Sequence, residues 1–431
     1  MIATLQYICL LVTDGKHGDC QNEEASGFYF ISCKDVRNGW IDYSGARQIT
    51  EKDYLDTHKR TKLEPNDILI TNSGTIGRMV LVPDAPETSK TTFQKSVAII
   101  KPNPQKVVPQ WLFYSLLANR ETLIAWAGGT AQKNLLLRDL RAFDMRIPTF
   151  QTQHKIAAIL SVYDDLIENN LRRTKILEEM AQSLYREWFV KFRFPGYHKV
   201  KMVDSPLGKI PEGWEIRQVD EVIETLGGGT PSTKEPSYWE GGNIDWYSPS
   251  DLTASGSMFI TGSSKKITQI GLDKSSAKLF PAYSLMMTSR ATIGVISINT
   301  EKACTNQGFI TCIPNDRLSV FHLYFWIKES REKIISVASG ATFKEISRGE
   351  FREFPIVVPP PFIENTFTET VEPMCRLIEN LIKKNHNLVV TRDLLLPKLI
   401  SGELDVSELD IKTGRNDPSP LVGEGWDGGN G

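Results

Sequence analysis

The chain has 431 residues, more than one hydrophobic core normally supports, so its length predicts at least two domains. Its 40% hydrophobic and 24% charged residues are typical of globular proteins, and no apolar run reaches the roughly 18 residues that would cross a membrane. The formal net charge of −2 excludes a general attraction to nucleic acid, so any DNA binding must come from local basic clusters.

The first elements are predicted from the start of the chain. MIATLQYICLLV is apolar but short, carries no basic residue and meets Asp14 instead of a small-residue cleavage site. We therefore expect the first strand or helix of a cytoplasmic protein. Farther on, DILIT (67–71) and SVAII (96–100) predict strands, and WLFYSLLANRETLIAWA (111–127) predicts an aromatic-faced helix. The six cysteines include no CxxC pair and are predicted to be buried thiols.

A long helix is predicted next, over 151–192. Its apolar side chains recur at alternating steps of four and three residues, which is the pattern of a coiled-coil seam. The seam residues are Ile156, Leu160, Tyr163, Ile167, Asn170, Thr174, Leu177, Ala181, Leu184 and Trp188.

The second half of the chain repeats the first. LITNSGTIG (69–77) returns as MMTSRATIG (286–294), and farther on Phe143 and Phe354 lie 211 residues apart. An internal repeat of this length indicates a tandem duplication with a mixed α/β fold in each half. Residues 1–60 and 215–279 align only faintly, so we expect a shared scaffold with different loops and two sites that read different things.

A second long helical stretch, 364–404, follows the second α/β unit. Its seam positions lie 211 residues after those of the first helix and are Phe367, Val371, Met374, Ile378, Leu381, Asn385, Leu388, Arg392, Leu395 and Leu399. Pro373 and Pro397 fall inside this pattern, and each removes a backbone donor. We therefore expect the second helix to be shorter than the first, bent, or to begin near Glu372.

The two seams predict that the helices pair with each other, antiparallel, with the α/β units at opposite ends. Asn170 and Asn385 either fix the register of this pair or face solvent at its edge. The seam from 156 to 188 spans roughly 50 Å, which equals about 15 base pairs. Two DNA-binding domains held that far apart would contact two half-sites separated by a gap that neither domain reads. Without nucleic acid, the same design would be a protein adaptor with a binding domain at each end.

No catalytic motif is found. In VPPPFIEN (358–365), Pro359 stands where an adenine methyltransferase needs a side-chain acceptor, and Asp84, Glu87 and Lys90 lack the spacing of a nuclease metal site. LGGGTPSTKE (226–235) lacks the pattern of a phosphate-binding loop, and the six histidines form no metal-binding cluster. We therefore expect neither catalytic nor metal-binding residues on this chain.

Turns in both halves combine glycine or proline with basic and amide side chains. Glycine lets the backbone approach phosphate, Lys and Arg supply charge, and Asn, Gln and Arg read base edges. Each turn alone is better explained as an ordinary hydrophilic loop. The predicted DNA-binding residues are Lys16, His17, Asn72, Ser73, Thr75, Arg78, Gln94, Lys95, Gln132 and Lys133 in the first half, and Thr230, Ser232, Lys234, Ser289, Arg290, Thr292, Asn306, Gln307, Thr342 and Lys344 in the second.

Two kinds of position are distinguished within these turns. Thr75/Thr292 and Gly77/Gly294 recur unchanged, which is expected of residues that maintain the scaffold. Arg290 replaces Ser73 on the same turn, which is the change expected if the two halves read different bases.

Longer segments carry a family resemblance. They are KIAAILSVYDDLIENNLRR (155–173), EEMAQSLYREWFVKFRFPG (178–196), PLGKIPEGWE (206–215), GTPSTKEPSYWEGGNIDW (229–246) and LLLPKLISGELDV (394–406). Over residues 1 to about 410 the chain resembles the specificity subunit of a type I restriction-modification system. The resemblance implies two target-recognition domains, each binding one half of a bipartite DNA site, and two helical spacers that form an antiparallel coiled coil.

The resemblance also implies domain boundaries and partners. The target-recognition domains would be 1–150 and 193–358, the helical spacers 151–192 and 359–410, and 411–431 a disordered tail rich in Gly, Pro and Asp. The implied partners are double-stranded DNA, two modification subunits that bind S-adenosylmethionine and methylate adenine, and restriction subunits that use ATP and Mg²⁺. The chain itself would be non-catalytic and carry no cofactor.

Some features depart from the family pattern. The first half begins at a position equivalent to about residue 215, so it lacks a counterpart of IPEGW. Only Pro148-Thr149 precedes the first long helix, and Glu364 stands where Gln is usual near the start of the second. A helix-linked protein adaptor without a DNA role and a self-contained methyltransferase or nuclease remain as alternatives.

Overall fold

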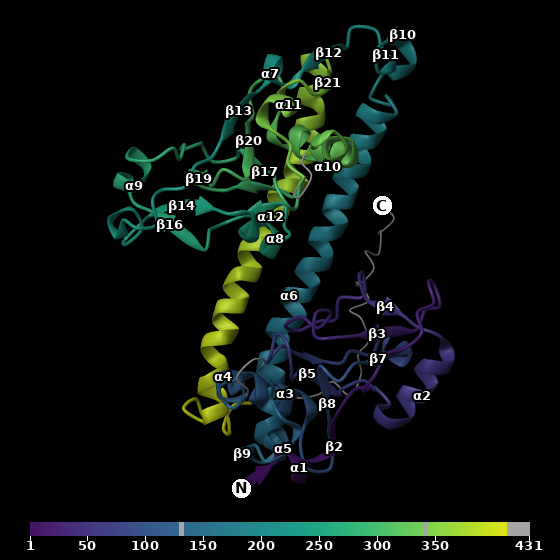
Figure 1. Cartoon of the computed structure of the whole chain (residues 1–431), viewed down its shortest axis with the longest axis vertical. Coiled ribbons are helices and arrows are strands. Elements are labelled where there is room, and N and C mark those ends of the chain that lie inside the picture. Colours follow the sequence, from purple (N-terminus) through teal and green to yellow (C-terminus); the bar gives the residue numbers. More distant parts are fainter. Residues whose placement is uncertain (129–132, 340–343, 412–431) are drawn as a thin grey trace, which may run out of the picture. The chain divides into compact units, whose positions relative to one another are not determined.

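The computed structural model describes residues 1–128, 133–339 and 344–411. The chain divides into two compact units, Met1–Leu166 together with the segment that begins at Leu388, and Ile167–Asn387. Two long helices, α6 (Phe150–Tyr185) and α12 (Pro361–Ser401), run through both units (Figure 1). Each unit therefore combines one α/β fold with one part of each helix.

The first unit is built on two sheets. Its main sheet has the order β2-β8-β5-β6 with antiparallel neighbours, and its strands are β2 (Cys9–Asp14), β8 (Val97–Pro102), β5 (Ile68–Thr71) and β6 (Met79–Leu81). The small sheet has the order β4-β3-β7, with strands β4 (Arg47–Gln48), β3 (Tyr29–Ile31) and β7 (Thr91–Phe93). Here β3 and β7 are parallel.

The second unit repeats this topology. Its main sheet has the order β13-β20-β17-β18-β15, with strands β13 (Glu224–Gly227), β20 (Phe309–Ile313), β17 (Leu285–Thr288), β18 (Ile296–Asn299) and β15 (Phe259–Ile260). Its small sheet has the order β16-β14-β19, with strands β16 (Lys265–Ile267), β14 (Ile244–Tyr247) and β19 (Ala303–Thr305). β14 and β19 are parallel, as β3 and β7 are. The predicted duplication is thus confirmed at the level of strand order, and β15 has no counterpart among the described residues of the first unit.

A third strand pair also recurs. β1 (Ile2–Thr4) pairs with β9 (Asp144–Arg146), as β12 (Glu215–Gln218) pairs with β21 (Pro355–Val358). The hairpin of β10 (Met202–Ser205) and β11 (Gly208–Pro211) precedes β12. The first half therefore starts at the equivalent of β12, as predicted.

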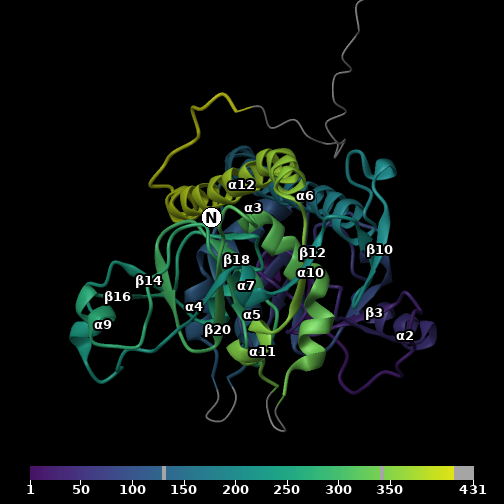
Figure 2. The ribbon, with the colours of Figure 1, turned by 90° about the horizontal axis from the view of Figure 1, so that it is seen from above.

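Short helices connect these strands. Those of the first unit are α1 (Leu5–Ile8), α2 (Glu51–Thr61), α3 (Pro109–Ala118), α4 (Arg120–Ala125), α5 (Leu137–Arg141) and the 3₁₀ turn Thr88–Lys90. Those of the second are α7 (Val219–Val222), α8 (Pro249–Ser255), α9 (Gln269–Asp273), α10 (Val320–Val337), α11 (Arg348–Arg352) and the 3₁₀ turns Tyr197–Lys199 and Pro236–Tyr238. In both views of the second unit, α9 and the small sheet lie away from the long helices (Figures 1 and 2).

The helix predicted over 111–127 is interrupted at Asn119. This residue has φ −98° and ψ 14°, and its side-chain amide donates to the Ser115 carbonyl at 2.8 Å, so α3 ends there and α4 begins at the next residue. In the second unit the equivalent segment is the single helix α10.

The predicted seam between α6 and α12 is confirmed. All the seam residues of both helices are buried or half-buried. In the first unit Asp164 binds Arg392 and Lys155 donates to the Ser407 carbonyl, and in the second Asn170 donates to Asn385 at 2.8 Å while the rings of Trp188 and Phe367 lie 5.8 Å apart. Residue numbers rise along one helix as they fall along the other, so the pairing is antiparallel in each unit.

The expectation that Pro373 and Pro397 shorten the second helix was wrong. α12 is one helix of 41 residues that contains both prolines. Both prolines are exposed, as are Glu369 and Asp393 four residues earlier, so water can bind the carbonyl groups that lose their helical partner.

The first helix departs from its predicted end, because α6 stops at Tyr185 and continues as a π-helical turn, Arg186–Val190.

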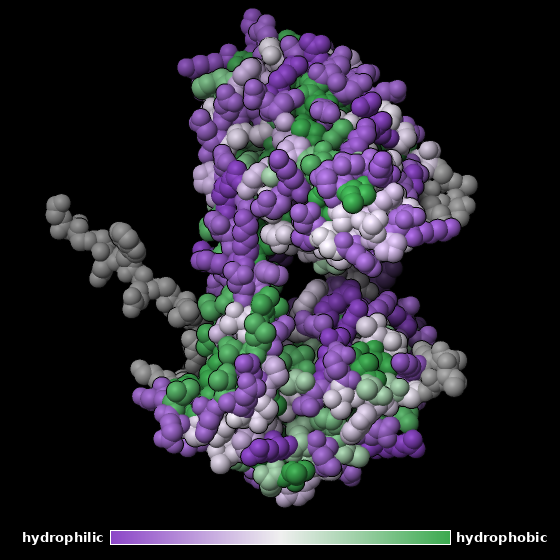
Figure 3. Space-filling view, turned by 90° about the vertical axis from the view of Figure 1, so that its left-hand side faces the viewer, coloured by the Kyte–Doolittle hydropathy of each residue, from purple (hydrophilic) through white to green (hydrophobic). Residues whose placement is uncertain are grey.

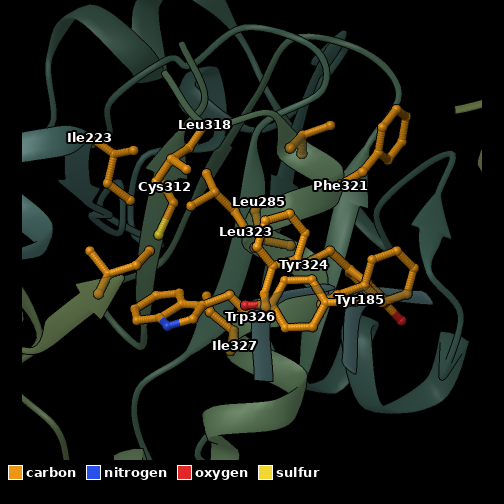
Figure 4. Packing of buried hydrophobic residues seen from close by; sticks show 14 of the residues in the cluster. Tyr185, Ile223, Leu285, Cys312, Leu318, Phe321, Leu323, Tyr324, Trp326 and Ile327 are labelled. Carbon is orange, nitrogen blue, oxygen red and sulfur yellow. The ribbon is translucent and has the colours of Figure 1, made fainter. Parts of the chain in front are cut away.

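Aromatic and aliphatic side chains tie the second unit to its part of the helices. Leu323, Tyr324 and Ile327 of α10 lie close to Leu285 of β17 and Tyr185 of α6 (Figure 4). Burial of each large side chain in such a cluster contributes roughly 1.5–3 kcal/mol. The helices are therefore part of the core of the unit.

The cysteine prediction holds for four of the thiols. Cys20, Cys304, Cys312 and Cys375 are buried, whereas Cys9 and Cys33 are half-buried. Burial raises the pKa of Cys304, Cys312 and Cys375 to about 12, so these thiols stay protonated and unreactive at neutral pH.

Candidate nucleic-acid interface

Backbone hydrogen bonds join the predicted turns of the second unit into one surface. Ser289 N–H donates to the Gly308 carbonyl at 2.8 Å, Ile346 N–H to the Ser289 carbonyl at 3.0 Å, and Gly229 N–H to the Thr305 carbonyl at 2.8 Å. These bonds join turns that lie at the ends of β13, β17, β19 and β20. We call the described residues of 227–234, 289–292, 306–308 and 344–345 the second turn surface.

The first unit joins its turns in the same way. Asn72 N–H donates to the Ser96 carbonyl at 3.1 Å, Leu135 N–H to the Asn72 carbonyl at 2.9 Å, and Lys95 N–H to the Lys16 carbonyl at 3.0 Å. We call the described residues of 14–19, 72–78, 93–95, 128 and 133–134 the first turn surface. Eight turns that are scattered in the sequence thus form two equivalent surfaces.

One repeated threonine holds the central turn of each surface. The buried Thr288 hydroxyl donates to the Thr292 carbonyl and accepts from Val295 N–H at 3.1 Å. Thr71 makes the same two bonds, to the Thr75 carbonyl and from Arg78 N–H at 2.9 Å. The hydroxyl satisfies backbone groups that the turn would otherwise leave unpaired.

Glycine is required at two repeated points of each surface. Gly77 and Gly294 have φ of +84° and +80°, and a Cβ there would lie 2.9 Å from Ile124 and from Arg331 respectively. A Cβ on Gly15 or Gly228 would lie 2.1 Å from the carbonyl oxygen of Phe93 or Asn306. Gly15 and Gly228 let neighbouring turns touch, whereas Gly77 and Gly294 let the central turn pack against α4 and α10. The scaffold role predicted for Gly77 and Gly294 is consistent with this geometry.

The first turn surface carries its charge in partly paired groups. Lys16 lies 3.4 Å from Asp56, and His17 Nε2 lies 2.9 Å from Asp14. Beside them the Arg47 guanidinium, 2.8 Å from Asp19, lowers the pKa of the Asp19 carboxyl. Lys95, Lys133 and Thr75 are exposed, and Ser73, Arg78 and Gln94 are half-buried.

The second turn surface has a different set of exposed groups. Thr230 donates to the Gln307 side-chain oxygen at 2.6 Å, and Arg290 Nε donates to Glu345 Oε1 at 2.6 Å. Asn306 is half-buried and accepts from Gly308 N–H at 2.8 Å. Ser232, Lys234, Thr292 and Lys344 are exposed.

Two predicted contact residues point inward. The exposed fraction of Asn72 is 8% and that of Ser289 is 2%, because both sit where the turns hydrogen-bond to each other. We therefore leave both side chains out of the contact set. Gln132 and Thr342 lie outside the described residues.

Sequence reasoning missed Glu345 and Asn134. They occupy equivalent positions 211 residues apart, and each forms an isolated backbone bridge to its neighbouring turn, Glu345 to Arg290 and Asn134 to Ser73. Their position just after GGTAQK and SGATFK, in the repeat, was the available signal. The acidic Glu345 is the opposite of what is expected on a surface that meets phosphates.

Neither a metal-binding cluster nor a membrane-spanning helix occurs among the described residues. Within 1–128, 133–339 and 344–411, His, Cys, Asp and Glu side chains form no group of three that could hold a metal ion. Over the same residues, every helix is too short or too polar to cross a bilayer.

Two segments, 16–179 and 211–388, match the family model described as "Type I restriction modification DNA specificity domain". The chain belongs to this family. The first match contains the first turn surface except residues 14 and 15, and the second match contains the whole second turn surface, so the family domain is present twice, once in each repeat.

Relatives of the chain are named as specificity subunits. The type I restriction enzyme MjaIX specificity subunit of Methanocaldococcus jannaschii is 32% identical over 203 residues, which cover 47% of this chain and 46% of that subunit. The HindI specificity subunit of Haemophilus influenzae is 26% identical over 369 residues, which cover 71% of this chain and 80% of that subunit. The predicted resemblance to specificity subunits, as opposed to catalytic subunits, is confirmed.

A solved structure shows the same fold. The type I restriction-modification S subunit from M. genitalium has a TM-score of 0.53 and 16% identity, and the match covers 93% of this chain and 96% of that one. At this identity the likeness concerns the fold alone.

Proposed function

We propose that the chain is the DNA-binding specificity subunit of a type I restriction-modification complex, and that each unit reads one half of a bipartite site through its turn surface. The observation that carries this proposal is the duplicated four-turn surface inside two copies of a DNA specificity domain. Thr71/Thr288 and Gly77/Gly294 keep the same frame, while exposed residues on it differ. A shared frame with different exposed groups is suited to reading two different half-sites.

The exposed polar groups have the chemistry that contact with DNA needs. We assign Lys95, Lys133, Lys234 and Lys344 to phosphates, because each is exposed at a turn and a lysine ammonium binds phosphate as a point charge. Amide side chains such as Gln94 and Gln307 are suited to base edges in the major groove. The remaining contact candidates are Lys16, His17, Ser73, Thr75, Arg78, Thr230, Ser232, Arg290, Thr292 and Asn306.

We retain the predicted domain boundaries within this proposal. The target-recognition domains are 1–150 and 193–358, and the helical spacers are 151–192 and 359–410. The first residues of α6 and α12, Phe150 and Pro361, support the starts of the two spacers. The tail 411–431 lies outside the described residues except for its first.

The long helices carry two exposed apolar surfaces, on faces related by the repeat, for docking partner subunits. Ile176 and Met180 of α6 are 56% and 54% exposed, and with Leu184 they line a shallow hollow in the second unit. The repeat places this face at 387–398 of α12, where Asn387 and Thr391 stand at the positions of Ile176 and Met180. The exposed apolar residues there are instead Val390 and Leu394, which are 44% and 64% exposed. Figure 3 shows apolar side chains gathered where the C-terminal part of α12 lies, on a face that is otherwise mostly hydrophilic. Exposed apolar groups on a charged helix favour a protein partner.

Two docking surfaces suit two modification subunits per chain. We propose that these subunits bind S-adenosylmethionine and methylate adenine, and that restriction subunits use ATP and Mg²⁺ when the complex acts on DNA in the cytoplasm. This chain contributes sequence recognition and the assembly surface, and the partner chains contribute the chemistry.

The docking proposal is tested by comparing two variants. Ile176→Ser/Met180→Ser and Val390→Ser/Leu394→Ser should each lose one of two bound modification subunits, measured by native mass spectrometry. A double change at Glu168 and Arg172, an exposed ion pair on α6, serves as control. Retention of both subunits by both variants would contradict docking at these surfaces.

The DNA-binding proposal is tested by selecting duplexes from a randomised library with the complex of this chain and its modification subunits. A bipartite motif with a gap of fixed length is expected. Neutralising Lys95 and Lys133 should weaken binding to all duplexes and reduce its dependence on salt, since each phosphate contact releases counterions. No enrichment of any sequence, or unchanged binding after neutralisation, would favour an adaptor without a DNA role.

A further inference from the structure

An acidic side chain lies on the second turn surface directly against Arg290. Arg290 Nε donates to Glu345 Oε1 at 2.6 Å, and the side chains are 47% and 42% exposed. Both groups therefore remain open to solvent on the surface that the proposed function assigns to DNA. A carboxylate in this position has to be explained, because DNA is a polyanion.

The contact uses only one part of the guanidinium group. Glu345 binds Nε, and neither terminal nitrogen of Arg290 is hydrogen-bonded to a described residue. The two terminal nitrogens form a planar fork of donors. This fork matches the O6 and N7 acceptors that guanine presents in the major groove.

The charge of Glu345 favours a base over a phosphate as the partner of Arg290. A phosphate bound by Arg290 would lie close to the Glu345 carboxylate and be repelled by it, whereas a neutral base edge would not. Lys344 is exposed next to this pair and forms no ion pair with a described residue, so it is the better phosphate ligand. The surface thus carries a base reader, Arg290, and a separate phosphate ligand, Lys344, on neighbouring turns.

The backbone holds both side chains in place. Glu345 N–H donates to the Ser339 carbonyl at 2.8 Å, Ser339 N–H returns a bond to the Glu345 carbonyl at 2.9 Å, and Arg290 and Glu345 form a backbone bridge. A side chain that is oriented before binding loses less conformational entropy on binding. In the first unit the equivalent bridge joins Ser73 and Asn134, which are both uncharged.

We propose that Arg290 reads a guanine in the half-site of the second unit and that Glu345 is the positioning residue that orients its terminal nitrogens. The proposal rests on the proposed function, since it requires the second turn surface to meet DNA. It adds the base that is read and a role for an acidic residue in reading it.

The test uses the full chain in complex with its modification subunits and a randomised duplex library. The wild-type complex should select guanine at one position of one half-site, and Arg290→Ala should lose this preference while the other half-site stays unchanged. Affinity of Arg290→Ala for the selected duplex should fall about 5- to 150-fold, as expected for loss of one bidentate contact. Thermal unfolding of each complex shows whether the variant is folded.

The role of Glu345 is tested by two variants at that position. Glu345→Gln keeps an oxygen that accepts from Arg290 Nε, so it should retain the guanine preference. Glu345→Ala should weaken this preference while binding to unrelated duplexes becomes tighter, because a negative charge is removed. Equal selectivity of Glu345→Ala and wild type would overturn the positioning role.

A chemical probe separates a base contact from a phosphate contact. Replacing the selected guanine by 7-deazaguanine removes N7, so wild type should lose affinity and Arg290→Ala should be insensitive. If Arg290→Ala instead weakens binding equally to all duplexes, Arg290 is a phosphate ligand and the inference is wrong while the proposed function stands. If the wild-type complex selects no sequence, the proposed function itself fails.

Discussion

At the scale of single residues, the duplication separates groups that build the turns from groups that face outward. Thr71 and Thr288 form the same buried hydrogen bonds in both units, although the residue two positions later is the half-buried Ser73 in one and the exposed Arg290 in the other. A buried hydroxyl that is bonded on both sides tolerates little change, whereas an exposed side chain can vary with the DNA sequence it meets.

The frame threonines give a prediction about stability. Thr71→Val and Thr288→Val keep the shape of the side chain but remove the hydroxyl that accepts from Arg78 N–H and Val295 N–H, and Val295 N–H keeps only its bond to the Thr292 carbonyl at 3.4 Å. Each variant should therefore lower the free energy of unfolding by about 1–3 kcal/mol. Denaturant unfolding measures the loss, and hydrogen exchange should locate it in the altered turn. Thr292→Ala, at an exposed position, should change stability by no more than about 0.5 kcal/mol. Similar losses in all three variants would contradict the role of the hydroxyl.

The start of each long helix is held by a side chain that differs between the units. Gln153 accepts from Val108 N–H at 2.8 Å, and Glu364, 211 residues later, accepts from Ser319 N–H at 3.0 Å. Glu364 also lies 2.6 Å from the buried His322, whose equivalent in the first unit is Trp111. The departure from the family pattern at Glu364 is therefore matched by a histidine that can carry a positive charge.

This buried pair predicts a dependence of stability on pH. Burial alone would raise the pKa of Glu364, but the His322 charge and the bonds from His322 and Ser319 hold it below its ordinary value of 4.5. A lowered pKa in the folded state means that the stabilisation is complete above about pH 5 and is lost as the pH falls through the folded pKa. Glu364→Gln should thus be less stable than wild type by about 1–3 kcal/mol at pH 7, and the difference should shrink as the pH falls through the folded pKa of Glu364.

Gln153 of the first unit offers a control in which the dependence of stability on pH should be reversed. Gln153→Glu would place a carboxylate near Trp111, where no described basic group bonds to Gln153, so it should be least stable at neutral pH and recover on acidification. Denaturant unfolding of both variants from pH 7 to pH 3 compares the two trends. Parallel trends in the two variants would show that His322 does not stabilise the Glu364 carboxylate.

At the scale of elements, local patterns predicted what depends on neighbours in the sequence. The four–three spacing predicted the seam because a helix places such positions on one side, and each of those positions is buried or half-buried. Pro373 and Pro397 were misjudged because the consequence of a missing donor depends on whether the freed carbonyl meets water or core, and both lie on the exposed side. The pairing of Arg290 with Glu345 could not be predicted from local patterns either, because it depends on which turns the sheet brings together.

The asparagine pair in the seam gives a prediction for the paired helices. Asn170 donates to the Asn385 side-chain oxygen at 2.8 Å, and Asn385 donates to the Ile167 carbonyl at 3.2 Å. Asn170→Leu alone should destabilise by about 1–3 kcal/mol because Asn385 loses a partner in the seam. The double variant with Asn385→Leu should be more stable than wild type, since a polar seam position fixes register at the expense of stability.

Denaturant unfolding of the four proteins in this cycle gives the coupling energy between the two residues. If the loss of the double variant equals the sum of the two single losses, the coupling energy is zero and the hydrogen bond between Asn170 and Asn385 contributes nothing. A double variant of raised stability that no longer binds DNA would show that the pair contributes register.

At the scale of the whole molecule, the duplication explains how a chain with a net charge of −2 can serve DNA recognition. Basic groups are placed at the turns of each unit, and carboxylates such as Asp14, Asp19 and Glu345 lie beside some of them. Attraction to any DNA is thereby weakened relative to contacts that require a particular base. The repeat was visible in sequence because scaffold positions recur at a fixed offset. In the proposed function the bases read depend on exposed residues that do not recur, so the sequence did not predict them.

The last prediction concerns the long helices as a spacer between half-sites. α6 has 36 residues and α12 has 41, and the same seam runs along both. Deleting one heptad from each helix at equivalent seam positions keeps the seam in phase and removes about 10 Å of paired helix, which corresponds to about three base pairs. If the helices set the gap, library selection with the shortened chain should return both half-sites unchanged with a gap shorter by about that amount. An unchanged gap would show that the helices do not set the spacing, and deletion from α6 alone, which takes the seam out of register, should abolish selection altogether.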